Sequence, residues 1–430
     1  MSLLVALLLA QAGDFSKEKL SNWHHWRGPN EDGTAPNADP PVEWSANKNV
    51  SWKLRIHGSG SATPVVWGDR IFVLTAIDTG KPGKPAGQKS DGQPGFTTPT
   101  PGTIHRFEVI ALDRATGKAV WTRTAVEEVP HEGRHDTNTY ASASPMTDGR
   151  ILIASFGSRG IFAYDLDGNP KWKRNLGLMK IKIGFGEGSS PVLHGDSVLV
   201  NCDHEAGSFL VCLDAKTGEP RWRQDRDEGT TWTTPLVVDK QVVVNGTKKT
   251  RSYDLATGKI VWECGGMGMN PIPMPVAREG LVYCMTGYKT FSIQAIRLDS
   301  QGDVTGTDRV VWKRNDAAPY VASPLLYGDL LYVTKEREVI LTCLDAATGA
   351  VKFGPERLPG IATLYASPVG AAGKVYWTGR NGRVLVLKHG PAFEVLASNE
   401  LGEGIDASPV LVGKQLFLRG EKHLYCIARE

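Results

Sequence analysis

This sequence of 430 residues has few of the features that indicate metal binding, nucleic-acid binding or membrane insertion. Its six cysteines form neither a C-x-x-C motif nor an adjacent pair, which argues against a metal or redox site built on thiols. Its net charge of +3 is too small to indicate nucleic acid or an anionic membrane as a partner. No apolar stretch is long enough to span a bilayer. The sequence leaves open whether one disulfide forms between neighbouring strands.

Catalytic motifs are also missing. No G-x-S-x-G, P-loop or Rossmann fingerprint occurs in a suitable setting. The glycine-dense stretch at 184–188 is not followed by a helix, so a loop is expected there rather than a phosphate cradle. Residues 131–135 fit the H-E-x-x-H zinc signature, but Gly133 interrupts the helix that this chemistry needs, and no third ligand presents itself. No metal site and no catalytic residue are therefore expected.

What the sequence does contain is one repeated pattern. Residues 111–121 read as a β-strand, a turn that Asp113 opens and Gly117 closes, and a second strand that carries Trp121. An aspartate at the first turn position accepts a backbone hydrogen bond from two or three residues on, and glycine adopts φ > 0 without a Cβ clash. Other copies contain Asp214, Gly218 and Trp222; Asp254, Gly258 and Trp262; and Asp345, Gly349 and Phe353, and degraded copies run over 165–172 and 299–312.

A proline precedes each unit and confirms the register. Seven of these prolines follow Ser or Thr and one follows Met274; they are Pro64, Pro145, Pro191, Pro235, Pro275, Pro324, Pro368 and Pro409. Apart from a first gap of 81 residues, successive prolines stand 40 to 49 residues apart. Units of this length with four short strands each are typical of propeller blades. The tryptophans are expected to lie between neighbouring blades.

The two ends of the repeat are complementary. Residues 48–52 resemble the final strand of a blade whose earlier strands are absent before it, and the last unit, at 409–427, lacks its final strand. We therefore predict an all-β fold: an eight-bladed β-propeller of four-stranded antiparallel blades, with the ring closed by the N-terminal strand.

The expected domain organisation has three parts. Residues 3–10 are apolar and lead into an A-x-A cleavage site, which predicts a signal peptide over 1–12. Residues 13–41 are polar and rich in Pro, Asn and Gly, and are expected to wrap the surface. The propeller follows over 42–430, with an insertion loop rich in Gly and Pro at about 79–103.

The A-L-D-x-x-T-G-K-x-x-W pattern resembles the pyrroloquinoline-quinone (PQQ) repeat. This repeat is shared by quinoprotein dehydrogenases and by the propeller lipoprotein of the outer-membrane β-barrel assembly machinery. Residues 23–29, W-H-H-W-R-G-P, are similar to a motif of secreted bacterial PQQ-like propellers, and further matching stretches are 138–142, 302–307 and 421–426. The resemblance covers roughly residues 22–430 and implies the fold more firmly than the function.

These observations predict an exported, monomeric, non-catalytic propeller that binds or scaffolds protein partners in the cell envelope, in the periplasm or outside the cell. Neither nucleic acid nor a transmembrane segment is expected. Recognition is expected on the face where the Ser/Thr-Pro steps meet, at His135, Tyr140, Glu187, Asp203, Trp232, Tyr320, Tyr365 and Asp406.

The resemblance leaves open a second reading, a quinoprotein dehydrogenase acting on alcohols or sugars. It implies PQQ in the central funnel, Ca²⁺ on carboxylate and amide oxygens, an aromatic floor and a vicinal disulfide. The chain has no adjacent cysteines, and the spacing of its funnel carboxylates singles out no calcium site. No cofactor is therefore expected, and PQQ with Ca²⁺ belongs to this alternative only.

Overall fold

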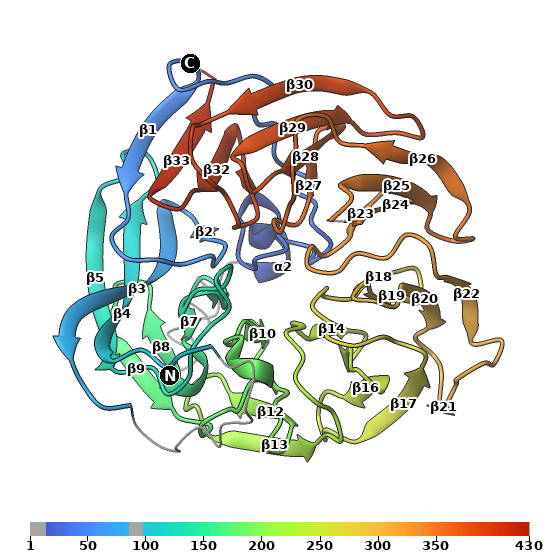
Figure 1. The fold of residues 1–430 in the computed structure, drawn as a ribbon, viewed down its shortest axis with the longest axis horizontal. Coiled ribbons are helices and arrows are strands. Elements are labelled where there is room, and N and C mark those ends of the chain that lie inside the picture. Colours follow the sequence, from blue (N-terminus) through green and yellow to red (C-terminus); the bar gives the residue numbers. More distant parts are fainter. Residues whose placement is uncertain (1–13, 86–97, 336, 430) are drawn as a thin grey trace, which may run out of the picture.

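Eight antiparallel sheets stand side by side around one axis in the computed structural model, which describes residues 14–85, 98–335 and 337–429 (Figure 1). The chain is an eight-bladed β-propeller, as predicted. The expected signal peptide, 1–12, lies outside the described residues, as does the middle of the expected insertion.

The first strand of each blade lies nearest the axis, beside the first strands of its neighbours. From the axis outwards, blades 1 to 4 consist of β2 (Val65–Trp67), β3 (Arg70–Pro82), β4 (Thr103–Asp113) and β5 (Ala119–Glu128); β6 (Met146–Thr147), β7 (Ile151–Ser155), β8 (Ile161–Asp165) and β9 (Pro170–Arg174); β10 (Val192–His194), β11 (Ser197–Cys202), β12 (Phe209–Asp214) and β13 (Pro220–Asp225); and β14 (Leu236–Val238), β15 (Gln241–Val244), β16 (Lys249–Asp254) and β17 (Ile260–Gly265).

Blades 5 to 8 consist of β18 (Val276–Arg278), β19 (Leu281–Thr286), β20 (Ser292–Arg297) and β22 (Val310–Arg314); β23 (Leu325–Tyr327), β24 (Leu330–Lys335), β25 (Ile340–Asp345) and β26 (Val351–Arg357); β27 (Val369–Ala371), β28 (Lys374–Thr378), β29 (Arg383–Lys388) and β30 (Val395–Glu400); and β31 (Val410–Val412), β32 (Gln415–Arg419), β33 (His423–Ala428) and β1 (Val50–Arg55). Inner strands are buried on both faces because each blade packs between two others, whereas outer strands such as β13 alternate in exposure.

The ring closes where β1, which precedes the first blade in the sequence, joins the last blade. β1 pairs antiparallel with β33, so that Trp52 lies opposite Cys426 and Leu54 opposite Leu424. The Trp52 ring lies 5.9 Å from that of Phe417 on β32. Closure by the N-terminal strand is thus confirmed. All six cysteines are buried and free, which answers the question of a disulfide.

The repeated turn works as a joint between blades. The Asp254 carboxylate accepts the Thr257 backbone N–H at 2.8 Å, which shapes the turn of blade 4. The indole N–H of Trp222 in blade 3 donates to the Leu255 carbonyl of that turn at 2.9 Å. The same bond joins Trp52 to Arg114, Trp121 to Leu166, Trp172 to Ala215 and Trp312 to Ala346.

Trp262 departs from this pattern, because the turn of blade 5, at 299–312, is a degraded copy with extra residues. Its indole N–H donates to Gln241 of its own blade at 3.0 Å. The extra residues of the degraded turn form β21 (Gly302–Asp303), a fifth strand that pairs in parallel with β17. One joint of the ring is therefore made by strand addition instead of an indole hydrogen bond.

Gly258 closes one of these turns with φ +72°, and a Cβ placed on it would lie 2.5 Å from Trp222 Cε3. Gly280 has φ +77° with nothing within 4 Å of the same position. We expect Gly280→Ala to cost about 1 kcal/mol of unfolding free energy through backbone strain alone. Gly258→Ala is expected to cost about 2 kcal/mol more, because the rigid indole has to move. Denaturant unfolding of both variants measures the difference in unfolding free energy. Equal losses in the two variants would contradict the packing of Trp222 on this turn.

The Ser/Thr-Pro steps form a belt of hydrogen bonds around the axis. In each case the backbone N–H of the residue before one proline donates to the hydroxyl before the next proline, as from Ser144 to Ser190 at 2.9 Å. The belt runs through Thr63, Ser144, Ser190 and Thr234, then from Met274 through Ser323, Ser367 and Ser408 back to Thr63. Met274 has no hydroxyl, so the belt has its gap there. This explains the residue types that precede the prolines.

The N-terminal segment occupies a different place from the one expected. Residues 13–41 were expected to wrap the surface, but Trp23, His25 and Arg27 are fully buried. α2 (Phe15–Glu18) and a 3-10 helix (Lys19–Ser21) lead into this stretch, and α2 lies over the centre of the ring (Figure 1).

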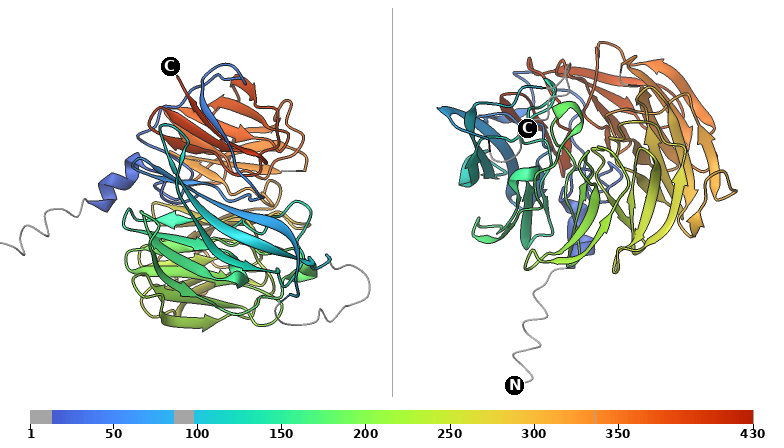
Figure 2. Two further views of the ribbon diagram at one scale, coloured as in Figure 1. Left: turned by 90° about the vertical axis from the view of Figure 1, so that its left-hand side faces the viewer. Right: turned by 60° about the horizontal axis from the view of Figure 1, so that its bottom comes forward.

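We call residues 22–35 the plug. Its backbone pairs with blade 1 through Trp23 and Val66, and with blade 7 through Thr34 and Gly370. Figure 2 shows α2 projecting from one face of the disc and the β3–β4 hairpin reaching toward the other. The plug therefore closes one end of the axial opening.

The insertion in blade 1 begins later than predicted. β3 continues to Pro82, which pairs with Thr103 at the start of β4, so residues 79–82 belong to a long hairpin and not to a loop. On the far side of the part that is not described, the Thr98 backbone N–H donates to the Ile183 carbonyl at 3.3 Å. The insertion thus returns to the core over the loop between blades 2 and 3.

Candidate functional site

The loops that connect successive blades gather at the end of the ring opposite the plug. There they surround a cavity of about 390 Å³, which we call the funnel. Rings from several blades line it: His135, Phe185, Trp232, Tyr288, Tyr320 and Tyr365. His135 lies edge-on to Phe185 at 4.9 Å, and Tyr288 lies 4.9 Å from Tyr320. The funnel wall therefore offers large, stiff, amphipathic surfaces.

Two arginines lie among these rings. Arg337 is exposed and stands 5.8 Å from the Tyr288 ring and 6.0 Å from the Tyr320 ring. Arg380 stacks on Tyr365 at 4.4 Å and donates from Nε to Asp406 Oδ1 at 2.6 Å. The Asp406 carboxylate is thus held by an arginine at the edge of the funnel.

Below the funnel lies a smaller axial cavity of about 130 Å³. Hydroxyls of the Ser/Thr-Pro belt surround it, and Trp26 of the plug also lines it. The Trp26 indole nitrogen is buried and has no hydrogen-bond partner among the described residues. The opening through the ring is therefore polar along its wall and ends at an indole of the plug.

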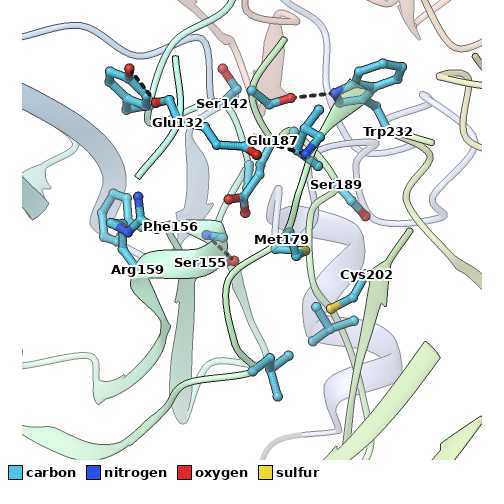
Figure 3. Close-up of a pocket in the computed structure, with 18 of the residues that line it drawn as sticks. Glu132, Ser142, Ser155, Phe156, Arg159, Met179, Glu187, Ser189, Cys202 and Trp232 are labelled. Atoms are coloured by element: carbon cyan, nitrogen blue, oxygen red, sulfur yellow. Dashed lines mark hydrogen bonds between the residues drawn. The ribbon is translucent and has the colours of Figure 1, made fainter. Parts of the chain in front are cut away.

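A third cavity of about 60 Å³ lies between the loops that enter and leave blade 2 (Figure 3). We call it the acid pocket, because Glu132 and Glu187 approach it from these two loops. Ser142, Gly188 and Trp232 line the acid pocket, the funnel and the axial cavity alike. The acid pocket therefore adjoins the funnel beside Trp232.

Backbone contacts hold the two glutamates in place. Glu132 Oε2 accepts the Ile181 N–H at 3.0 Å, and Glu187 Oε2 accepts the Ser158 N–H at 2.7 Å. Ser158 belongs to a 3-10 helix (Gly157–Arg159), and Ile181 precedes another (Lys182–Gly184). The Tyr140 hydroxyl donates to the Glu132 carbonyl at 3.0 Å and ties the first loop to itself.

Burial keeps both glutamates from ionising readily. Desolvation, with a smaller contribution from Glu187, raises the pKa of Glu132 to about 7. Desolvation also raises the pKa of Glu187, against the opposing charge of Arg159. Desolvation and the adjacent Arg159 lower the pKa of His131 to about 4, so this imidazole is neutral at pH 7.

Because the pKa of Glu132 is higher in the folded chain than its ordinary value of 4.5, the folded state binds more protons than the unfolded state between about pH 4.5 and 7. Its contribution to stability is present at low pH and is lost as the pH rises through 7. Glu132→Gln removes this loss while keeping an acceptor for the Ile181 N–H. We expect the stability of the variant relative to the unaltered protein to increase from pH 5 to pH 8 in urea unfolding. A stability difference between the two proteins that stays constant from pH 5 to pH 8 would contradict the raised pKa of Glu132.

The eight residues predicted from the sequence fall into two neighbouring groups. His135, Tyr320, Tyr365 and Asp406 line the funnel. Tyr140, Glu187 and Asp203 line the acid pocket, and Trp232 lies between the two. The Asp203 carboxylate is fully buried and bound by Arg226 at 2.7 and 3.1 Å. Their part in recognition stays a prediction.

The H-E-x-x-H stretch forms no helix, as expected. His131 Nε2 lies 2.7 Å from the Met179 carbonyl and Nδ1 lies 2.5 Å from Arg159 Nη2, so both ring nitrogens face protein groups. His135 is exposed at the funnel instead. Within the described ranges, no group of three His, Cys, Asp or Glu side chains is placed to hold a metal ion.

Sequence reasoning missed several residues of the site. Tyr288 and Arg337 sit in the connections between the second and third strands of their blades, and Glu132 was considered only as part of a zinc motif. Their position in the repeat could have identified them, because these connections and the segments before each Ser/Thr-Pro step lie on the same face in every blade.

A family model described as outer membrane protein assembly factor BamB matches residues 41–180 and 105–354, which together span most of the propeller. The chain belongs to this family. Among curated proteins, a sequence comparison finds no significant match. In the described part of the chain, no helix is long and apolar enough to cross a membrane.

Solved structures similar to this BamB-family chain include a BamB protein and two dehydrogenases. BamB from Moraxella catarrhalis has 14% identity, covers 83% of this chain and 98% of its own, and superposes with a TM-score of 0.52. A europium-containing methanol dehydrogenase has 12% identity, a TM-score of 0.63 and coverage of 96% and 99%. The quinohemoprotein alcohol dehydrogenase from Comamonas testosteroni has 12% identity, a TM-score of 0.62 and coverage of 98% and 83%. At these identities the likeness concerns the fold alone.

Proposed function

We propose that this protein is an exported, non-catalytic binding module of the cell envelope, located in the periplasm or outside the cell, whose funnel receives a segment of a protein partner. The observation that carries the proposal is the funnel itself: a ring-lined cavity open at one end of a rigid propeller whose other end the plug closes. Membership of the BamB family supports a role in protein binding at the envelope.

The chemistry of the wall favours a polypeptide as the occupant. Tyrosine, tryptophan and arginine are the side chains that most often dominate protein–protein recognition, because they bury a large area with few rotatable bonds and keep a polar end. Here they come from different blades, so a rigid scaffold fixes their spacing. A partner segment would dock on them with little rearrangement of the propeller.

The proposal is tested by affinity capture from an envelope extract of the source organism. We expect the unaltered protein to recover one reproducible partner, and the double variant His135→Ala with Tyr365→Ala to recover about tenfold less. The matched control is Val311→Ala with Val395→Ala, two exposed apolar residues on outer strands β22 and β30. A funnel variant that retains every partner at the control level would contradict the proposal.

The PQQ dehydrogenase alternative has a specific requirement, a free set of oxygen ligands for Ca²⁺ in the funnel. Asp406 is paired with Arg380 and Asp203 with Arg226, and the six cysteines are free and not adjacent. These donors do not fit that cofactor, and we derive no reaction from it. Calorimetry with PQQ, with and without Ca²⁺, is expected to show no saturable binding; saturable binding that requires Ca²⁺ would favour the dehydrogenase.

A further inference from the structure

The two carboxylates of the acid pocket differ from the other charged groups around it, because neither of them forms an ion pair among the described residues. Arg159 forms an ion pair with Glu128, and Asp203 forms one with Arg226. Among the described residues, Glu132 and Glu187 take part in no ion pair, and their hydrogen bonds come from backbone N–H groups. Arg159 lines the same cavity and its charge acts on Glu187, but the ion pair that it forms is with Glu128. Both carboxylates therefore lack a cation in direct contact among the described residues.

A buried amide at the same cavity, that of Asn201, lacks a hydrogen-bond donor for its oxygen. Asn201 lines the acid pocket and is only 3% exposed, and its Oδ1 has no hydrogen-bond partner among the described residues. Its Nδ2 donates to Thr231 Oγ1 at 3.1 Å and to Asp203 Oδ2 at 3.3 Å, so the surrounding acceptors fix which end of the amide is the oxygen. A buried acceptor without a donor costs free energy, which a bound donor would recover.

The remaining wall is mixed: Arg159, His131 and several hydroxyl groups line it together with apolar side chains. Phe156, Met179 and Val200 contribute carbon surface beside the three acceptors. The volume of about 60 Å³ corresponds to roughly four water positions, which suits a cationic head followed by a few methylene groups. A bound cation would stabilise the ionised form of both glutamates, which burial disfavours, whereas a carboxylate or phosphate would disfavour it further. A neutral apolar group would leave the Asn201 oxygen without a donor.

We infer that the acid pocket is an anchor site for a primary ammonium or guanidinium group on an apolar stem. This inference rests on the proposed function, because the pocket opens beside Trp232 at the funnel wall, where a partner segment would lie. The same chemistry has two sources: a lysine or arginine side chain of that segment, or a free alkylamine. In either case the head group donates to Glu132, Glu187 and Asn201, and the stem packs on the apolar side chains of the wall.

Isothermal titration of the full chain tests the site with n-butylammonium, n-butylguanidinium and uncharged n-butanol. We expect saturable binding of the cations and none of butanol. Glu132→Gln and Glu187→Gln are each expected to weaken cation binding about tenfold, and Asn201→Ala about threefold. Glu127→Gln, an exposed glutamate on β5, is the matched control and is expected to leave affinity unchanged. Cation-dependent stabilisation in thermal unfolding, present in the control and lost in Glu187→Gln, gives a readout independent of the titration.

Blocked pentapeptides with a central Lys, Arg or Leu distinguish the two sources. Lys or Arg peptides that bind more tightly than butylammonium, with the Leu peptide inactive, indicate a side chain of a partner. Butylammonium binding with all peptides inactive indicates a free amine.

If butanol binds as well as the cations, or if Glu127→Gln weakens binding as much as Glu187→Gln, the inference is wrong. Loss of the captured partner in the His135/Tyr365 double variant, together with absence of cation binding, would remove this inference and leave the proposed function standing.

Discussion

Arg27→Ala is expected to lower the free energy of unfolding by about 3–5 kcal/mol. Arg27 is fully buried in the plug, and its guanidinium donates to the Pro324 carbonyl at 2.6 Å and to the Pro368 carbonyl at 3.0 Å. These prolines belong to the Ser/Thr-Pro steps of blades 6 and 7. Removing the side chain leaves two buried carbonyls without donors and a cavity beside them.

Chemical denaturation of Arg27→Ala beside Arg55→Ala measures this effect. Arg55 ends β1 and is exposed, so its replacement controls for the loss of one positive charge and is expected to change stability by less than about 0.5 kcal/mol. Equal unfolding midpoints for the two variants would show that the plug does not tie the blades together. Burial lowers the pKa of Arg27 to about 10, so the result is expected to be the same from pH 6 to pH 8.

Trp52→Ala is expected to cost as much as Trp222→Ala, about 3 kcal/mol in each case. Trp52 joins the last blade to the first, and Trp222 joins blade 3 to blade 4. The two indoles donate to equivalent carbonyls at 3.1 and 2.9 Å. Their rings pack on equivalent glycines, where a Cβ would come within 2.7 and 2.5 Å. The same geometry predicts the same energy, although one joint links distant parts of the sequence.

Denaturant unfolding of the two tryptophan variants in parallel measures this equality. A cost for Trp52→Ala that is smaller by more than about 1 kcal/mol would mean that the ring is weakest where the chain ends meet, against the account of closure given above. Phe107→Ala, in the core between blades 1 and 2, is the control for loss of a large ring that makes no indole hydrogen bond to a turn.

The fold was predictable because its repeat combines local and long-range requirements in one short pattern. Asp254 and Gly258 are needed to form the turn, and Trp222 of the preceding blade is needed to hold it. A sequence that satisfies both shows them at a fixed spacing. Closure was predictable as well, because the incomplete blades at the two ends were complementary.

The plug was not predictable from composition. Its polar residues and its Pro, Asn and Gly content suggested a surface segment. The groups that the Arg27 side chain contacts are backbone carbonyls of distant blades, which no side-chain pattern reports. The acid pocket was hidden for a similar reason. Glu132 and Glu187 are 55 residues apart in the sequence, in two separate interblade loops, and Asn201 lies in a strand whose pattern indicates a core position. The sequence suggested one face, and the division of that face into funnel and pocket depends on three-dimensional packing.

The central claim is that partners bind at the funnel end of the ring. Hydrogen–deuterium exchange of the protein alone and in the captured complex tests it most directly, because backbone protection reports every face in one experiment. We predict new protection in the interblade loops 129–145, 175–191 and 358–368, and unchanged exchange in the D-x-x-T-G turns at the plug end. Protection confined to those turns or to the outer strands, with the funnel loops unchanged, would contradict the account.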